Sequence, residues 1–359
     1  MLVEGIGVDW STRRSLFGGR NGGARTVEGR IVTKLYDVFC YRRYTFHKTF
    51  LLQILEYNVL GGKQFRALIL IYAYQLVTNK FTKENMRLVR IVAWCMELTQ
   101  AAAIMIDDLQ DQSLFRRGNP CWYRCDQIEL AAITDALKLK HSIFYLIKKH
   151  CKGKECYVDL METFEETSSK TVDGQILDLQ LSTNVNKKPN LELFTMDTYN
   201  CIVRNKTSYY SVVLPITIAM HLAGIKDRES FMQAESISLE IGRLFQIQDD
   251  FLDCFGDSEV SGKDSTDIQD GKCTWFVVEA LQRATPEQRK ILEECYGFSD
   301  PEKVKRVKQL YTDLNLQKIY TLYENKVYNL INKRVQQMSC GILHELFVNL
   351  LKAFYHRKS

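Results

Sequence analysis

The chain has 359 residues but only 5 prolines and 19 glycines. Collagen-like and low-complexity proteins are far richer in these residues, so both classes are excluded. With 46% hydrophobic and 25% charged residues, the composition is that of an ordinary globular protein and not of a disordered one. Because proline breaks helices, its scarcity favours long helices.

The eleven cysteines form no CxxC pair, and no histidines lie at metal-ligand spacing near them. This pattern disfavours both a structural zinc site and a disulfide framework, and it is typical of thiols in a reducing compartment. We therefore expect a cytoplasmic protein. The net charge of +5, from 48 basic and 43 acidic residues, is too small for a dedicated nucleic-acid-binding protein, so no nucleic-acid partner is expected.

No uninterrupted apolar run is long enough to cross a membrane. The longest apolar stretch, residues 88–106, contains Arg90, Glu97 and Gln100, and a membrane-spanning helix would have to bury all three. The stretch is predicted to be a core helix, and no membrane span is expected.

Residues 1–30 differ from the rest of the chain. They contain seven of the 19 glycines and five arginines, but no apolar periodicity and no hydrophobic run of the length found in secretory signals. We expect a disordered or targeting segment. Glu4, Asp9 and Glu28 are not typical of a mitochondrial transit peptide, and import into mitochondria is kept as the alternative to the cytoplasm.

From about residue 31 onward, apolar residues recur every three or four positions, as in amphipathic helices. Residues 51–60, 67–76, 86–106 and 237–255 are the clearest examples, and no convincing period-two strand is present. We predict an all-α fold in which residues 31–359 form one domain, with helices surrounding a shared cavity.

Two acidic clusters follow apolar helical segments. Asp107 and Asp111 are four residues apart, as are Asp249 and Asp253, so each pair lies on one helix face one turn apart. Like charges at this spacing repel unless a cation binds them, and Mg²⁺ takes one or two carboxylates together with phosphate oxygens and water. A single cluster would fit a solvated helix end, but the repetition predicts a magnesium-diphosphate site.

Basic residues suited to phosphate accompany both acidic clusters. Gly61-Gly62-Lys63 and Arg66 form a predicted turn into a helix with free backbone N–H groups. The other basic residues are Arg116 and Arg117 beyond the first cluster, and Lys206, Lys263 and Lys272. Together they predict two diphosphate-binding sites.

Six motifs occur in order, and together they resemble those of animal farnesyl diphosphate synthases. They are Gly61-Gly62-Lys63-x-x-Arg66, Asp107-Asp108-x-x-Asp111-x-Ser-x-x-Arg116-Arg117-Gly118, Gly174-Gln175-x-x-Asp178-Leu179, Lys206-Thr207, Phe245-Gln246-x-x-Asp249-Asp250-x-x-Asp253 and Thr266-Asp267-x-x-x-x-Lys272-x-x-Trp275. The resemblance runs from about Glu56 to the C-terminus.

This resemblance implies an isoprenoid synthase fold, a homodimer, and head-to-tail transfer of a prenyl group from an allylic diphosphate to isopentenyl diphosphate. Asp107 and Asp111 would bind two Mg²⁺ ions, and Asp249 and Asp253 would bind a third. When the residue roles are carried over by motif, the allylic diphosphate would contact Arg116, Lys206, Thr207, Gln246, Lys263 and Lys272. Of these, Lys206, Thr207 and Gln246 would act in catalysis. Isopentenyl diphosphate would contact Lys63, Arg66, Gln100 and Arg117.

The sequence departs from this family at three places. Ala102 and Ala103 stand where animal farnesyl synthases resemble one another in having two aromatic residues that form the floor of the chain pocket. Phe65 replaces the usual asparagine between Lys63 and Arg66. The basic C-terminus, residues 356–359, is shorter than the tail of the family.

These departures leave three hypotheses open. The first is prenyl transfer that yields farnesyl diphosphate or, with a deeper pocket, a longer product. The second is a terpene synthase derived from a farnesyl synthase, which ionises geranyl or farnesyl diphosphate without isopentenyl diphosphate. The third is a non-catalytic partner subunit, which is disfavoured because such a subunit would be expected to lose metal ligands.

Overall fold

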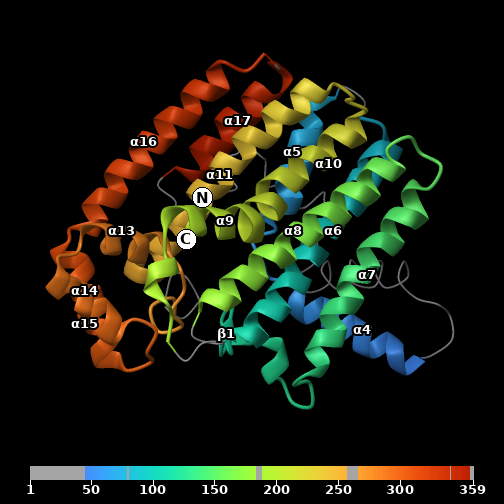
Figure 1. Cartoon of the computed structure of the whole chain (residues 1–359). Coiled ribbons are helices and arrows are strands. Elements are labelled where there is room, and N and C mark those ends of the chain that lie inside the picture. Colours follow the sequence, from blue (N-terminus) through green and yellow to red (C-terminus); the bar gives the residue numbers. More distant parts are fainter. Residues whose placement is uncertain (1–44, 79–80, 183–187, 257–265, 340, 356–359) are drawn as a thin grey trace, which may run out of the picture. The chain divides into compact units, whose positions relative to one another are not determined.

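A computed structural model describes residues 45–78, 81–182, 188–256, 266–339 and 341–355. The N-terminal segment 1–30, Lys263 and the basic C-terminus lie outside these ranges, so the predictions for them stay predictions. Apart from one short hairpin, the regular structure of the described chain is helical (Figure 1). The prediction of an all-α fold is confirmed.

The described chain divides into two compact units. Unit 1 comprises the described parts of Met1–Phe164 and Pro215–Asp227, and unit 2 comprises those of Glu165–Leu214 and Arg228–Ser359. Two helices change unit along their length: α8 (Tyr157–Leu181) at residue 164 and α10 (Leu214–Ala223) at its first residue. The prediction that residues 31–359 form one domain stays a prediction.

Unit 1 is built around α6, the long apolar helix predicted from the sequence. Figure 1 shows α6 and α7 side by side, and α5 also packs on α6. The elements of unit 1, besides parts of α8 and α10, are α4 (Thr45–Asn58), α5 (Phe65–Val77), α6 (Lys83–Gln110), β1 (Phe115–Arg116), β2 (Asn119–Pro120), η1 (Trp122–Arg124) and α7 (Ala131–Cys151).

The residues of α6 explain both where it begins and what it buries. Thr82 caps its first turn by accepting a hydrogen bond from the N–H of Asn85, 3.1 Å away. Val92, Cys95 and Leu98 are fully buried at helical spacing. Helix α6 is long and apolar enough to cross a bilayer, yet 56% of its most apolar window is buried within the protein. Our interpretation of α6 as a core helix stays a prediction.

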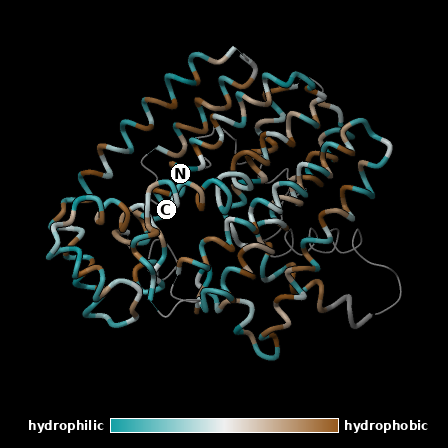
Figure 2. The backbone as a smooth tube through the Cα atoms, viewed as in Figure 1, coloured by the Kyte–Doolittle hydropathy of each residue, from teal (hydrophilic) through white to brown (hydrophobic). Residues whose placement is uncertain are grey.

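Unit 2 contains the second aspartate cluster, on helix α11. Its elements, besides the rest of α8 and Leu214, are η2 (Leu191–Leu193), α9 (Met196–Ile202), the π-helix η3 (Val203–Val213), α11 (Arg228–Phe255), α13 (Trp275–Arg283), α14 (Pro286–Cys295), α15 (Pro301–Asp313), α16 (Leu316–Gln336) and α17 (Gly341–Phe354). In Figure 2, hydrophobic and hydrophilic residues alternate along these helices, as expected for helices with one buried face.

The core of unit 2 is rich in aromatic side chains. Trp275, Phe276 and Tyr311 are buried in one cluster, and the rings of Phe251 and Tyr320 stack with centroids 4.2 Å apart. Burial of such large rings supplies much of the hydrophobic stabilisation of a domain. This cluster fixes the C-terminal half of α11, which carries Asp249 and Asp253.

Helices α11 and η3 approach each other closely at a glycine. A Cβ atom on Gly242 would lie 2.6 Å from Cβ of Ser208, closer than real carbon atoms come. Any side chain at residue 242 would therefore push the two helices apart, and glycine is required for the contact.

We predict that Gly242→Ala lowers the free energy of unfolding by about 1–3 kcal/mol, the usual cost of overpacking a buried contact. Urea unfolding followed by circular dichroism measures the change. The control is Gly341→Ala, since a Cβ atom there would meet nothing within 4 Å. Equal stability of the two variants would show that the helices separate without cost.

Candidate active site

The first aspartate cluster forms the last turn of α6. Asp107 and Asp111 are partly buried, and the N–H of Asp111 donates to the carbonyl of Asp107 at 2.8 Å, which closes the helix. The predicted one-turn spacing of these two carboxylates is therefore present. Asp108, between them, is buried, with 3% of its surface exposed.

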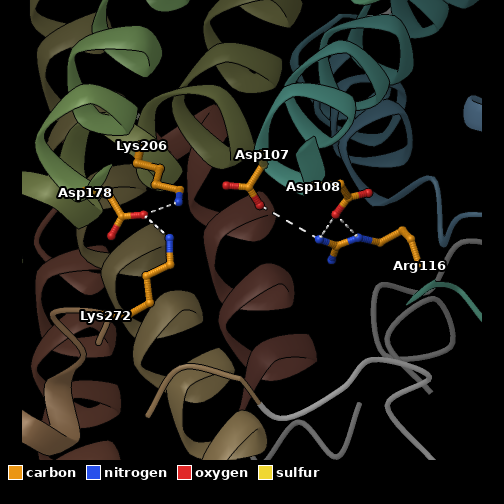
Figure 3. A network of polar contacts seen from close by, with 6 residues as sticks. All are labelled: Asp107, Asp108, Arg116, Asp178, Lys206 and Lys272. Atoms are coloured by element: carbon orange, nitrogen blue, oxygen red, sulfur yellow. Dashed lines mark hydrogen bonds and ion pairs between the residues drawn. The ribbon is translucent and has the colours of Figure 1, made fainter. Parts of the chain in front are cut away.

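Arg116 is bound to this turn by two acidic side chains (Figure 3). Its Nε donates to Oδ1 of Asp108 at 2.9 Å, Nη2 contacts the same oxygen, and Nη2 lies 3.8 Å from Oδ2 of Asp107. Burial acts to lower the pKa of Arg116, but the charge of Asp108 and its hydrogen bonds outweigh burial and raise it. Asp108 thus holds a permanently charged guanidinium beside the predicted metal ligands.

The hairpin that follows presents Arg117. Its strands pair Arg116 with Asn119, so Arg117 and Gly118 form a two-residue turn. Both have positive φ, 56° and 75°, which is the conformation of a type I′ turn. Nη1 of Arg117 donates to the carbonyl oxygens of Leu60 and Asn58, at 3.2 and 3.5 Å.

The glycine-rich turn is shaped to receive Arg117. A Cβ atom on Gly62 would lie 2.8 Å from Nη2 of Arg117, so any side chain there would displace the guanidinium group from this position. Lys63, next to this turn, is exposed, and Arg66 at the start of α5 is partly buried. The structure thus brings Arg117 to the glycine-rich turn that leads to Lys63 and Arg66. The resemblance implied that these three residues bind the same diphosphate.

Helix α6 contributes two further polar residues to this region. Gln100 is partly buried, and its Oε1 is buried without a hydrogen-bond partner among the described residues. Glu97, almost one turn earlier, is buried, and its Oε1 accepts the backbone N–H of Ala67 at 3.2 Å. In the sequence, Glu97 stands out only as a charged residue that interrupts an apolar run.

In unit 2, one buried carboxylate binds two predicted substrate-binding lysines. Oδ2 of Asp178 accepts from Nζ of Lys206 at 2.6 Å and from Nζ of Lys272 at 2.9 Å (Figure 3). Burial acts to raise the pKa of Asp178, but the two ammonium charges outweigh burial and lower it. Lys206 from η3 and Lys272 from a loop are therefore held together by an anion from α8.

The position of Lys206 depends on unusual backbone geometry. Helix η3 is a π-helix, in which each N–H bonds to the carbonyl five residues earlier, as Leu214 does to Tyr209. Helix α8 approaches η3 so closely that a Cβ atom on Gly174 would lie 2.2 Å from the backbone nitrogen of Lys206. This explains the glycine in the motif that also contains Asp178.

Thr207 and Gln246, both predicted to act in catalysis, are in contact. The hydroxyl of Thr207 donates to Oε1 of Gln246 at 2.8 Å, and Nε2 of Gln246 donates to Oδ1 of Asp250 at 2.9 Å. Oδ2 of Asp250 also accepts from the hydroxyl of Tyr199 and from the N–H of Trp275. Burial, the largest cause, raises the pKa of Asp250 to about 7. Asp250 therefore orients Gln246, and through it Thr207.

Asp249 and Asp253 are partly buried on α11. The carboxylate of Asp253 accepts backbone N–H groups from Thr266 at 3.3 Å and Asp267 at 3.2 Å. Asp253 thus fixes the beginning of the segment that leads to Lys272.

The donor set of both aspartate clusters fits magnesium. All the ligands are carboxylate oxygens, which this hard cation prefers. Among the described residues, no three His, Cys, Asp or Glu side chains converge as a ready-made metal cage. Mg²⁺ needs no such cage when a bound diphosphate and water supply most of its ligands.

Two of the departures from the resembled family fall on described residues. Ala103 is partly buried and lies one turn before Asp107 on the same face of α6, and Ala102, one residue earlier, is 9% exposed. Phe65 is buried at the first position of α5. Its apolar ring therefore packs into the interior, and its effect on the isopentenyl diphosphate site stays a prediction.

Four structurally important side chains were missed or left without a role by the sequence analysis. Asp108, Asp178 and Asp250 occur within the quoted motifs, but no pattern shows that they bind other protein residues. Glu97 carries no motif at all. A charged residue inside an apolar helical stretch was the only signal available for it.

We predict that Asp178→Asn lowers the free energy of unfolding at neutral pH by about 3 kcal/mol, since it leaves buried Lys272 without its anion. Glu166→Gln, which removes an exposed ion pair with Lys170 on the same helix, should cost less than about 0.5 kcal/mol.

The pH dependence of this stabilisation follows from the lowered pKa of Asp178 in the folded state. Its contribution is complete above the unfolded pKa and is lost as pH falls through the lower, folded pKa. The stability difference between wild type and Asp178→Asn should therefore be constant from pH 5 to 8 and shrink below about pH 4. A difference that shrinks with rising pH would contradict the ion-pair assignment.

Comparison with known proteins agrees with this arrangement. Residues 48–314 match the family model for polyprenyl synthetase. The farnesyl pyrophosphate synthase of Murgantia histrionica is 47% identical over 312 residues, which cover 86% of this chain and 76% of the relative. That of Gallus gallus is 42% identical over 308 residues, covering 85% and 83%. The chain therefore belongs to the polyprenyl synthetase family and, within it, is similar to the farnesyl pyrophosphate synthases of animals.

Proposed function

We propose that this protein catalyses head-to-tail prenyl transfer, in which isopentenyl diphosphate is joined to dimethylallyl or geranyl diphosphate to give farnesyl diphosphate. The observation that carries this proposal is the presence of two separate cationic sets, each of which has a buried carboxylate close enough for their charges to interact. Lys206 and Lys272 share Asp178, whereas Arg66 and Arg117 are associated with Glu97. A reaction between two diphosphates requires two such sets.

Members of this family are generally Mg²⁺-dependent, and we assign the metal ligands by motif. Asp107 and Asp111 hold two ions, and Asp249 and Asp253 hold a third. Bound to the allylic diphosphate, Mg²⁺ supplies positive charge that stabilises the diphosphate as a leaving group.

The residues of the chain then act on charge that develops during the reaction. Arg116, Lys206 and Lys272, together with Gln246 and by motif Lys263, bind the allylic diphosphate and stabilise the negative charge that grows as the C1–O bond breaks. The hydroxyl of Thr207, oriented by Gln246, presents its dipole near the allylic cation. An apolar pocket must exclude water from that cation.

Lys63, Arg66, Gln100 and Arg117 bind the diphosphate of isopentenyl diphosphate. Its double bond attacks C1 of the allylic cation, which forms the new carbon–carbon bond and leaves a tertiary cation. A proton is then lost to the released diphosphate, and the double bond of the product forms. The buried, unpartnered Oε1 of Gln100 supports a polar contact at this site.

A terpene synthase derived from this family is the second candidate. The observation that favours it is Ala102 and Ala103, whose side chains are much smaller than the aromatic ones that the resembled family has at these positions. The replacement of the usual asparagine by Phe65 is a further argument for it, and the burial of the ring does not test that argument.

Product analysis separates these candidates. Purified protein is incubated with Mg²⁺ and geranyl or farnesyl diphosphate, with and without isopentenyl diphosphate, and the products are identified by gas chromatography and mass spectrometry. Prenyl transfer gives lengthened diphosphates only when isopentenyl diphosphate is present. A terpene formed from the allylic diphosphate alone would overturn the proposal, and products beyond farnesyl diphosphate would indicate that Ala102 and Ala103 deepen the pocket.

We also propose that the protein is a cytoplasmic homodimer. The nine cysteines on which the structure reports are free thiols, in keeping with a reducing compartment. Leu130, Ile133, Leu137 and Tyr145 are exposed at spacings that place them on one face of α7 or next to its start. Such an apolar face supports an interface with a second copy.

We predict that Asp107→Ala or Asp249→Ala lowers turnover by about three orders of magnitude, because each variant loses a ligand for a charge-stabilising ion. Helical circular dichroism should be unchanged. Chelation of Mg²⁺ should abolish wild-type activity reversibly. The control is Asp313→Ala, an exposed residue of α15. Activity like that of wild type in either cluster variant would refute the metal assignment.

We predict that Leu137→Glu converts the homodimer to a monomer of 41.8 kDa, because a charge cannot be buried unpaired in an apolar interface. Analytical ultracentrifugation measures the mass. Leu322→Glu changes a leucine on α16 that is even more exposed, and this variant should remain dimeric. Dissociation of both variants, or of neither, would place the interface elsewhere.

A further inference from the structure

Glu97 is a buried acid inside the most apolar helix of unit 1. It is 5% exposed, and its pKa is raised, because burial outweighs the opposing effects of the charges of Arg66 and Arg117 and of the N–H of Ala67. A buried carboxylate is costly unless charged or hydrogen-bonding partners compensate it. None of the chemical steps proposed above uses this residue.

The first interaction of Glu97 caps a helix that has no side-chain cap of its own. Helix α5 begins at Phe65, and the preceding Gln64 has a positive φ of 52° and makes no capping hydrogen bond. The N–H of Ala67, the third residue of α5, bonds instead to Oε1 of Glu97 at 3.2 Å. A carboxylate at a helix N-terminus also interacts favourably with the helix dipole. Glu97 therefore fixes the direction in which α5, and with it Arg66, leaves the glycine-rich turn.

The second interaction of Glu97 is with the arginines of the proposed isopentenyl diphosphate site. Arg66, Arg116 and Arg117 are close enough that the charges of the other two lower the pKa of Arg117, in addition to the effect of its burial. The charge of Glu97 opposes this. Without a nearby anion, Arg66 and Arg117 would repel each other, and Arg117 stands on a turn with access to solvent.

From these contacts we infer that Glu97 is a positioning residue for the second diphosphate site, which caps α5 and holds the guanidinium groups of Arg66 and Arg117 in place for isopentenyl diphosphate. The inference rests on the proposed function. Glu97 does not touch the reacting atoms. It acts through the two arginines, so its loss changes the binding of one substrate and not of the other.

The variant Glu97→Gln separates charge from shape. A glutamine has the same size and can still accept the N–H of Ala67, so the cap is kept while the negative charge near the arginines is lost. We expect the KM for isopentenyl diphosphate to rise about tenfold, because the two guanidinium groups lose the carboxylate whose charge offsets their mutual repulsion. The KM for geranyl diphosphate should stay within about twofold, because Lys206 and Lys272 depend on Asp178 instead.

A second variant guards against a folding defect. Glu97→Asp keeps the charge but withdraws it by one methylene group, and it should show the same selective rise in KM. The control is Glu84→Gln, on the exposed first turn of the same helix, which should match wild type in both KM values. Thermal unfolding of each variant reports any general loss of stability.

Three outcomes would overturn the inference. They are an unchanged KM for isopentenyl diphosphate, an equal rise in both KM values that accompanies a loss of stability, and tighter binding of isopentenyl diphosphate. The last would show that Glu97 only offsets the positive charge of the site.

Titration calorimetry of wild type and Glu97→Gln with isopentenyl diphosphate keeps the test separate from the proposed function. If the wild-type protein binds isopentenyl diphosphate but does not turn it over, the prenyl-transfer proposal fails while the calorimetry still tests the role of Glu97.

Discussion

Negative charge placed inside the protein has to be balanced by positive charge, and this requirement arranges the cationic residues of the site. Asp178 is nearly inaccessible to solvent and shares one oxygen between Lys206 and Lys272. Those two residues are 66 positions apart in the chain, on a helix and on a loop, and without the shared anion nothing in their own segments would keep two ammonium groups adjacent. Asp108 plays the same part for Arg116, and we infer the same for Glu97 with Arg66 and Arg117.

Close approach of helices is the second requirement. Gly174 lets α8 contact the backbone of Lys206, and Gly242 lets α11 contact Ser208. In unit 2, η3 therefore packs against one glycine of each of these two helices. A π-helix is a costly local conformation that is common at functional sites. Here it carries Lys206 and Thr207, whose side chains meet Asp178 and Gln246. Packing against the glycines therefore supports both the backbone and the polar contacts of these residues.

The carboxylates of the two aspartate motifs divide between two tasks. Asp108 and Asp250 are buried and bind protein groups, whereas Asp107, Asp111, Asp249 and Asp253 stay partly accessible even though Asp107 and Asp253 also contact protein groups. A carboxylate already occupied by an arginine or by three protein donors has little capacity left for an ion. The accessible four are those that the helical spacing had selected as magnesium ligands.

The sequence by itself determined the helical fold, the two aspartate pairs and the identity of most cationic residues, because these depend on periodicity and on spacing along a helix. It also revealed the family through the order of its motifs. It did not reveal Glu97 or the π-helix, and it gave Asp178 and Asp250 no role, since each depends on residues that are distant in the chain. It did not show that the ring of Phe65 is buried. Only the tertiary structure decided which carboxylates bind protein cations and which stay accessible, because burial and pairing arise from the packing of segments that no local pattern connects.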